Sequence, residues 1–243
     1  MTVLAGAVAA LVAGFVKGTI GFGFPTVATP LLALFIDVKT AVAVLVPPNL
    51  VLDGIQARRG GGLVRTLRRF AVLLVFGGAG TVIGTHLLVI LPARVAMAVL
   101  GAFVIGFVAI SATRWRPSVR VSWEPWLSPP IGLLAGVVGG LTNVPGTPLV
   151  VYFYALGLAK TDFVRAVAVT FFVYKVMQLA VLAWYGAFTV ALIPAALGVT
   201  AVALGSFTLG LRVQDRLDQQ SFNRVVLIVL AVLGAWLTIR ASV

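Results

Sequence analysis

Apolar residues fill most of the chain in long, almost uncharged stretches, and short arginine-bearing segments separate them. A helix that crosses a bilayer needs about 20 predominantly apolar residues. Stretches of about this length predict membrane spans at 41–57, 70–91, 95–111, 163–185, 187–211 and 222–239. The first of these carries Pro47-Pro48, which predicts a kink in that span.

Two further apolar stretches, 2–36 and 131–158, are broken by glycine and proline. Their central parts read AGFVKGTIGFGFPTVATPLLAL and AGVVGGLTNVPGTPLVVYFYALGL. Dense glycine lowers helix propensity and proline interrupts the hydrogen-bond ladder, so each stretch is expected to form two short helices of about 10–15 residues. The alternative is one kinked helix, which in 131–158 would have to be long or steeply tilted.

The two broken stretches resemble each other, which indicates an internal duplication. Ala13-Gly14 and Gly18 recur as Ala135-Gly136 and Gly140, and the run from Ala41 recurs from Ala166. A repeat at a constant offset of about half the chain is the signature of a duplicated unit.

The arginines give the two halves opposite orientations. Segments 58–69, 112–128 and 212–224 carry most of the basic residues, and by the positive-inside rule all three are cytoplasmic. Stretch 131–158 must then enter and leave on the cytoplasmic side, whereas 2–36 does so on the outer side. The predicted fold is therefore all-α and polytopic, with two inverted-topology repeats, each a re-entrant broken-helix hairpin plus three transmembrane helices. The repeats are 1–111 and 131–243, joined by a cytoplasmic linker at 112–130.

Composition narrows the function. Hydrophobic residues make up 61% of the chain and charged residues only 10%, and the net charge of +12 lies between the spans, so it orients a multi-pass protein in a membrane and does not indicate nucleic-acid binding. The absence of cysteine and the single histidine argue against thiol chemistry and zinc hydrolysis, and no cofactor, metal or catalytic residue is predicted.

The hairpin breaks predict an anion site. If they enter from opposite faces, they meet near the midplane, where the second helices begin around Thr26 and Thr147-Pro148. Helix N-termini attract anions, although these residues also suit a helix start with no ligand. Lys175, at the middle of 163–185, is expected to face the same cavity because a charge there is costly in lipid. Lys17 lies just before the first break and is expected to approach from the other half.

Polar residues near the breaks complete the candidate site. The Ala41/Ala166 register pairs Asn49 with Tyr174 and Asp53 with Gln178, and Asp53 is assigned to an interfacial ion pair with Arg58. For the uncharged residues, bridging neighbouring helices is the alternative. The predicted substrate-binding residues are Lys17, Thr19, Gly21, Phe22, Gly23, Phe24, Asn49, Asn143, Gly146, Thr147, Tyr174, Lys175 and Gln178.

The glycine-rich break followed by proline, present in both halves, resembles the sulfite exporter TauE/SafE family over about residues 4 to 239. The resemblance implies a transporter of sulfite, sulfonates or related small anions in the cell inner (plasma) membrane. The family's glycine-rich segments correspond to Gly18, Gly21 and Gly23 in the first half and to Gly139, Gly140 and Gly146 in the second. Phe22 and Phe24, and Asn143-Val144-Pro145, depart from the common pattern and leave the identity of the anion open.

Three functions are consistent with these features to different degrees. A secondary transporter that moves small anions by alternating access about a midplane site is favoured, and a passive anion channel is the alternative. An intramembrane enzyme has only His86 beside Thr85 in its favour, so no enzymatic activity is predicted. The expected partners are a small anionic substrate and the lipid bilayer, while a coupling ion, the direction of transport and the oligomeric state stay open.

Overall fold

The structure is a computed structural model that describes residues 2–59, 61–92, 95, 118–144, 146–218 and 220–221. Every regular element among these residues is a helix, as predicted. They are α1 (Thr2–Ile20), α2 (Phe24–Leu32), α3 (Val38–Arg58), α4 (Leu63–Arg69), α5 (Ala71–Ile90), η1 (Val121–Trp123), α7 (Glu124–Thr142), α8 (Gly146–Ala155), α9 (Lys160–Trp184), η2 (Val190–Leu192) and α10 (Ile193–Arg216).

Four of these helical segments are long and apolar enough to cross a membrane: Val38–Arg58, Ala71–Ile90, Lys160–Trp184 and Val190–Arg216. They coincide with the spans predicted at 41–57, 70–91, 163–185 and 187–211. The spans predicted at 95–111 and 222–239 fall almost wholly outside the described residues. Helix α7 begins at Glu124, so the last part of the segment expected to be a linker is already helical.

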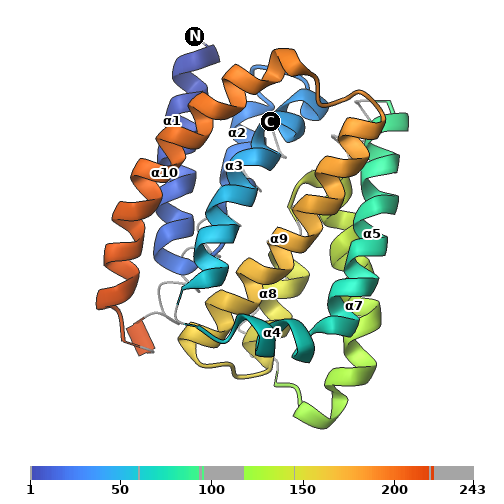
Figure 1. The fold of residues 1–243 in the computed structure, drawn as a ribbon, viewed down its shortest axis with the longest axis vertical. Coiled ribbons are helices and arrows are strands. Elements are labelled where there is room, and N and C mark those ends of the chain that lie inside the picture. The colour runs from blue at the N-terminus through green and yellow to red at the C-terminus, as the bar shows by residue number, and fades with distance from the viewer. Residues whose placement is uncertain are drawn as a thin grey trace.

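The two broken stretches each fold back on themselves (Figure 1). Leu32, the last residue of α2, packs beside Gly6 near the start of α1. Likewise, the Tyr152 hydroxyl near the end of α8 lies 3.0 Å from Ser128 Oγ near the start of α7. Each stretch is therefore a helical hairpin, and the single kinked helix is excluded for both.

Glycine and asparagine make the two turns possible. Gly21 and Gly23 have φ angles of 89° and 98°, and Asn143 has a φ of 66°. This left-handed region is accessible to glycine at no steric cost, and asparagine is among the few other residues that adopt it. Each turn therefore ends its first helix abruptly.

In each hairpin the first helix is about twice as long as the second. Helices α1 and α7 have 19 residues each, whereas α2 and α8 have 9 and 10. A helix of that longer size rises about 28 Å, close to the roughly 30 Å of a bilayer core. The first break consequently lies near the end of α10, where Gln214 Nε2 donates to the Thr19 carbonyl at 3.3 Å. At the second break Asn143 contacts Thr29 of α2 and Lys175 near the middle of α9.

Most arginines of the described residues gather at one end of the molecule, drawn at the bottom of Figure 1. Ion pairs and hydrogen bonds join the elements there: Arg59 after α3 pairs with Asp215 of α10, and Arg69 of α4 pairs with Glu124 of α7. Glu124 raises the pKa of Arg69, chiefly through these hydrogen bonds. We call this end, made by the C-terminal ends of α3 and α10, by α4, and by the starts of α7 and α9, the arginine end.

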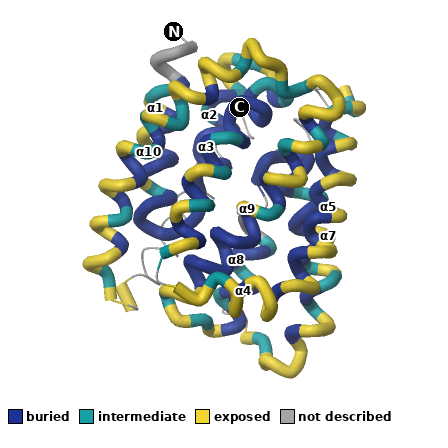
Figure 2. The backbone as a smooth tube through the Cα atoms, in the orientation of Figure 1, coloured by how far each residue is buried: buried dark blue, intermediate teal, exposed yellow. Residues whose placement is uncertain are grey.

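Close glycine contacts hold two long helix pairs together, α1 with α10 and α5 with α7. A Cβ at Gly18 would lie 2.3 Å from the Phe207 carbonyl, and one at Gly136 would lie 2.1 Å from the Gly77 carbonyl. Such small residues let membrane helices approach backbone to backbone. Between these pairs, α3 packs against α9, and Figure 2 shows that the middle parts of α3 and α9 are largely buried.

Candidate functional site

Three polar side chains form a buried stripe along α3. Asn49, Asp53 and Gln56 follow one another at intervals of four and three residues, so they share one face of the helix. All three are at most 1% exposed. A polar stripe facing the protein interior inside an apolar helix is expensive in a membrane, which makes it a candidate for function.

Asp53 forms an ion pair with Lys17 of α1. Lys17 Nζ lies 2.5 Å from Asp53 Oδ1, and neither side chain is exposed. The assignment of Asp53 to an interfacial pair with Arg58 is therefore wrong. Sequence distance suggested Arg58, but Asp53 points to the interior face of α3 while Arg58 is exposed.

Lys175 of α9 is held by the second hairpin. Its Nζ donates to Asn143 Oδ1 and to Gln178 Oε1, each at 2.5 Å, and to the Asn143 carbonyl at 3.3 Å. Gln178 Nε2 in turn donates to the Gly140 carbonyl at 3.0 Å. The ammonium group thus sits against the turn that ends α7.

Asn143 also joins the two hairpins. Its Nδ2 donates to Thr29 Oγ1 of α2 at 2.9 Å, and both residues are fully buried. Because Asn143 Oδ1 accepts from Lys175 at the same time, one amide links the first hairpin, the second hairpin and α9. A movement of either hairpin would change the position of the Lys175 ammonium relative to α2.

Phe171 lies between the two lysines. Lys17 Nζ is 5.5 Å from the centre of the Phe171 ring, and Phe171 is one helical turn before Lys175. The charges of Lys17, Asp53 and Lys175 interact with one another. We call these three residues, with Asn49, Asn143 and Gln178, the lysine cluster.

The lysine cluster contains polar atoms that have no protein partner among the described residues. Both side-chain polar atoms of Asn49 and the Oδ2 atom of Asp53 are buried without a hydrogen bond. Gly54 packs against Phe172, and α3 and α9 run in opposite directions, so Asn49 lies at about the level of Lys175. Buried polar groups are normally paired, and unpaired ones at a charged cluster are typical of a ligand site.

A comparison with protein families gives this cluster a context. The model of the sulfite exporter TauE/SafE family matches residues 6–237, nearly the whole chain. The chain belongs to this family. No curated protein and no solved structure matches the chain.

Membership in the TauE/SafE family makes the protein a membrane transporter of the sulfite exporter class. The match covers both hairpins and the helices between them, so the lysine cluster lies within the matched region. Among the described residues no group of three or more histidine or carboxylate side chains is placed to hold a metal ion.

Several residues that the sequence singled out lie outside the lysine cluster of this TauE/SafE protein. Thr19 Oγ1 donates to the Phe15 carbonyl within α1, and the Tyr174 hydroxyl donates to the Leu73 carbonyl of α5 at 3.2 Å. The Phe22 ring packs edge-on against Phe163, in an apolar cluster. These three side chains join or pack helices.

The glycines and Phe24 shape the hairpins. Gly21 and Gly23 form the first turn, and Phe24 begins α2 and is buried in an apolar cluster with α1, α3 and α10. Gly146 begins α8, and Thr147 follows it within that helix. The residues with contacts around the lysines are thus Lys17, Asn143, Lys175 and Gln178 of the predicted set, and Asn49 lies one turn from Asp53 on the buried face of α3.

Sequence reasoning missed the roles of Thr29, Asp53 and Gln56. The spacing of Asn49, Asp53 and Gln56 on one helix face was the available signal, because three polar residues in register within an apolar span indicate an inward-facing stripe. Thr29 carried no such signal, since its partner Asn143 is more than a hundred residues away.

Proposed function

We propose that this TauE/SafE protein is a secondary transporter of small anions, with sulfite or organosulfonates as substrates, and that the lysine cluster binds them. The observation that carries the proposal is the charge of the cluster. Lys17 and Lys175 contribute two positive charges and Asp53 one negative charge, all in side chains at most 1% exposed.

An excess positive charge inside an apolar protein requires compensation. A single charge at the bilayer centre costs on the order of 3 kcal/mol or more. Asp53 compensates Lys17, with which it pairs, whereas the hydrogen-bond acceptors of Lys175 are the neutral oxygens of Asn143 and Gln178. An anion beside Lys175 would neutralise the excess positive charge. It would also accept a hydrogen bond from the Asn49 amide, which has no partner among the described residues and lies at about the same level.

The chemistry of the cluster suits sulfite and sulfonates. Their oxygens accept hydrogen bonds, and amide N–H and ammonium groups donate them. Asn49 Nδ2 has no partner among the described residues and supplies such a donor, and Lys175 supplies the positive charge. The aromatic ring of Phe171, beside Lys17, offers an apolar contact for the organic part of a sulfonate.

Reciprocal packing supports a pair of inverted repeats. The first hairpin packs through α1 on α10, a helix of the second half, and the second hairpin packs through α7 on α5, a helix of the first half. The register pairs Asp53 with Gln178, and each reaches the first helix of its own hairpin: Asp53 contacts Lys17, and Gln178 contacts Gly140. Exchange of hairpins between halves is the arrangement expected for two units related by inversion.

In the proposed mechanism the hairpins open the cluster to each side in turn. The second hairpin starts at the arginine end and the first at the opposite end, so movement of each hairpin would expose the cluster toward a different face. In this proposal the protein lies in the inner membrane. By the positive-inside rule the arginine end then faces the cytoplasm, and α1 and α2 enter from outside. Asn143 couples the two movements through Thr29 and Lys175.

Transport by purified protein in liposomes tests the proposal. Liposomes are loaded with unlabelled anion, and uptake of radiolabelled sulfite, methanesulfonate or chloride is followed under an imposed proton or sodium gradient. We expect saturable uptake of sulfite or methanesulfonate that exceeds equilibrium when the correct gradient is present. Flux that only equalises concentrations and does not saturate would indicate a passive channel, and absence of flux for all anions would refute the proposal.

A further inference from the structure

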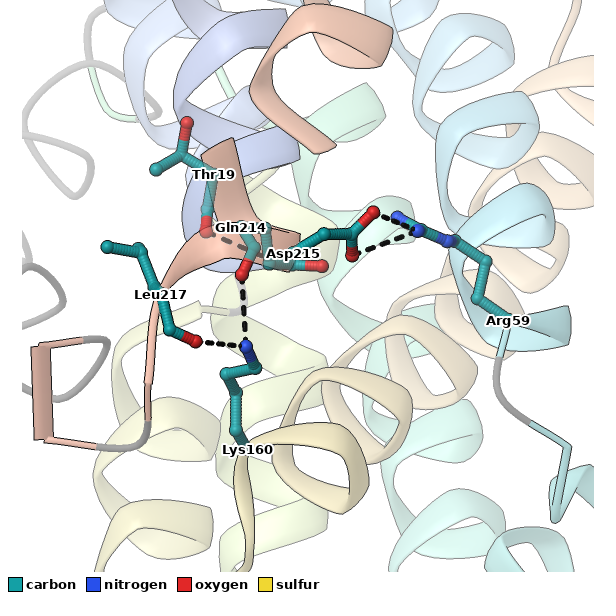
Figure 3. A network of polar contacts seen from close by, with 6 residues as sticks. All are labelled: Thr19, Arg59, Lys160, Gln214, Asp215 and Leu217. Carbon is teal, nitrogen blue, oxygen red and sulfur yellow. Dashed lines mark hydrogen bonds and ion pairs between the residues drawn. The ribbon is translucent and has the colours of Figure 1, made fainter. Parts of the chain in front are cut away.

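A cavity of about 140 Å³ lies at the arginine end, where α3, α9 and α10 meet (Figure 3). It is separate from the acceptors of Lys175, which lie at the other break. Its lining residues are Gln56, Arg59, Lys160, Thr161, Val164, Arg165, Gln214 and Asp215. Arg59 and Asp215 are 38% and 58% exposed, so the mouth of the cavity is open to solvent.

The charges around this cavity are mainly positive. Arg59, Lys160 and Arg165 line it, and Asp215 is the carboxylate in the lining. Asp162, which accepts from Arg165 Nη1 at 2.8 Å, brings the count to three positive and two negative charges. The cavity is therefore electropositive even after both carboxylates are included.

Each cation is held in place by the protein. Arg59 Nη2 donates to both oxygens of Asp215, at 3.0 and 2.7 Å. Lys160 Nζ donates to the backbone carbonyls of Gln214 and Leu217, at 3.0 and 2.5 Å. Figure 3 shows these groups converging from α3, α9 and α10. The positions of the charges are thus fixed before any ligand arrives, which reduces the entropic cost of binding one.

Gln56 points to a ligand independently of these charges. It lines the cavity, is 1% exposed, and neither Nε2 nor Oε1 has a hydrogen-bond partner among the described residues. An unpaired buried amide costs about 1–3 kcal/mol, so an apolar side chain would be more stable here unless a ligand pairs with the amide. The Nε2 group is a donor, which suits an anion.

The first turn of α9 adds a further attraction for an anion. Thr161, in that turn, lines the cavity, and the residue before the helix, Ala159, has no side-chain acceptor to cap the N–H groups. The positive end of the helix dipole therefore points toward the cavity region.

The cavity also leads to the lysine cluster. Gln56 is on the same face of α3 as Asp53, one turn away, and Asp53 contacts Lys17. Val164 in the cavity wall packs against Gly21 in the turn of the first hairpin. A ligand in the cavity would therefore adjoin both the polar stripe of α3 and the first hairpin break.

From these observations we propose that the cavity is a second anion-binding site, a vestibule that holds an oxyanion or sulfonate group between Gln56, Arg59, Lys160 and the start of α9. The role of the vestibule as the entry or exit site for the lysine cluster rests on the proposed transport function. Its ability to bind an anion follows from its lining residues alone. The Asp215 carboxylate accepts hydrogen bonds from the Arg59 guanidinium in the structure, so an incoming anion competes with that carboxylate.

Equilibrium binding of radiolabelled sulfate and of methanesulfonate to the purified full-length protein in detergent tests this site. Gln56→Leu keeps most of the side-chain volume and removes the amide, and we expect it to weaken binding about tenfold, the effect of one hydrogen bond to a charged group. Asp215→Asn removes the competing carboxylate and is expected to strengthen binding several-fold. Arg68→Gln removes an exposed arginine of α4 at the same end, outside the cavity, and is expected to leave binding unchanged.

The two sites are separated by their variants. Lys175→Met is expected to abolish transport while anion binding at the vestibule persists. Such binding would support the vestibule even if no tested anion were transported. Sulfate binding that is lost in Lys175→Met but unchanged in both Gln56→Leu and Asp215→Asn would overturn the vestibule and leave the lysine cluster as the binding site. Failure of the wild-type protein to bind either probe would also overturn it. Thermal unfolding checks the fold of Gln56→Leu, which is expected to be intact because Gln56 has no hydrogen-bond partner to lose among the described residues.

Discussion

Lys17 Nζ lies 2.5 Å from Asp53 Oδ1, and both side chains are wholly withdrawn from solvent. The pair joins the first helix of the first hairpin to the central helix α3. Because Asp53 Oδ2 has no partner in the described part of the chain, the carboxylate retains one oxygen for a further donor. The pair is thus both a helix contact and a part of the lysine cluster.

Removing one member of this pair is expected to destabilise the protein more than removing both. Asp53→Leu leaves a buried ammonium without its counter-charge, and Lys17→Met leaves a buried carboxylate, each at a cost of about 3–5 kcal/mol. The double variant Lys17→Met, Asp53→Leu replaces the pair with apolar side chains and is expected to recover most of that loss. Thermal unfolding of the three purified variants measures the difference.

The same double variant separates structure from transport. It is expected to fold but to transport no anion, because one of the two lysines and the carboxylate are gone from the cluster. A double variant that transports at the wild-type rate would show that the ion pair only joins helices. A double variant less stable than both single variants would contradict the pairing itself.

Lys175 is expected to be essential for anion binding and dispensable for insertion. Lys175→Ala removes the ammonium that lies 2.5 Å from Asn143 Oδ1, and substrate binding at the lysine cluster should weaken by about a hundredfold or more. Lys175→Arg should recover binding only partly, because the guanidinium is larger and forked. Saturation of uptake in liposomes against substrate concentration gives the affinities.

Lys39→Ala is the matched control for Lys175. Lys39 is also a lysine in a spanning helix, but its Nζ donates to the Val89 carbonyl near the end opposite the arginine end. Its loss should leave substrate affinity unchanged. Equal affinity in Lys175→Ala and wild type would remove Lys175 from the site.

Sequence patterns were sufficient to predict the helices and the hairpin turns, for clear physical reasons. Apolar runs of bilayer length have few alternatives to a membrane helix, and the four described spans lie where those runs predicted them. The turns were also readable, because glycine at Gly21 and Gly23 relieves a left-handed backbone that other residues resist. Lysine within apolar segments likewise indicated burial, which holds for Lys17 and Lys175.

Sequence patterns did not predict contacts that depend on which faces of distant helices pack together. Asp53 was assigned to its sequence neighbour Arg58, but its partner Lys17 is 36 residues away on another helix. The vestibule was invisible to sequence analysis because Gln56, Lys160 and Asp215 come from three helices and share no local motif.

Asp37 at the start of α3 is expected to stabilise the protein in a pH-dependent way. Partial burial raises its pKa, but hydrogen bonds from Thr40 outweigh this and leave the pKa below its usual value of 3.8. The carboxylate thus stabilises the fold above pH 3.8, and this contribution is lost as the pH falls through the lowered pKa. Because Asp37 is exposed, Asp37→Ala should cost only about 0.5 kcal/mol after solvent screening. Thermal unfolding at pH 7 should show the loss, and the difference between the two proteins should shrink as the pH falls below 3.8.

Glycine contacts between α5 and α7 are expected to tolerate no added methyl group. A Cβ at Gly136 would lie 2.1 Å from the Gly77 carbonyl and 2.8 Å from the Thr81 nitrogen, both backbone atoms that cannot rotate away. Gly136→Ala must therefore separate the helices, at a cost of about 1–3 kcal/mol or more. Gly205→Ala on α10 is the control, since no described residue lies within 4 Å of that Cβ, and the better helix propensity of alanine should stabilise the protein by about 0.5–1 kcal/mol. Thermal unfolding of both variants should show opposite shifts, and an unchanged melting temperature in Gly136→Ala would mean that α5 and α7 are farther apart than the structure places them.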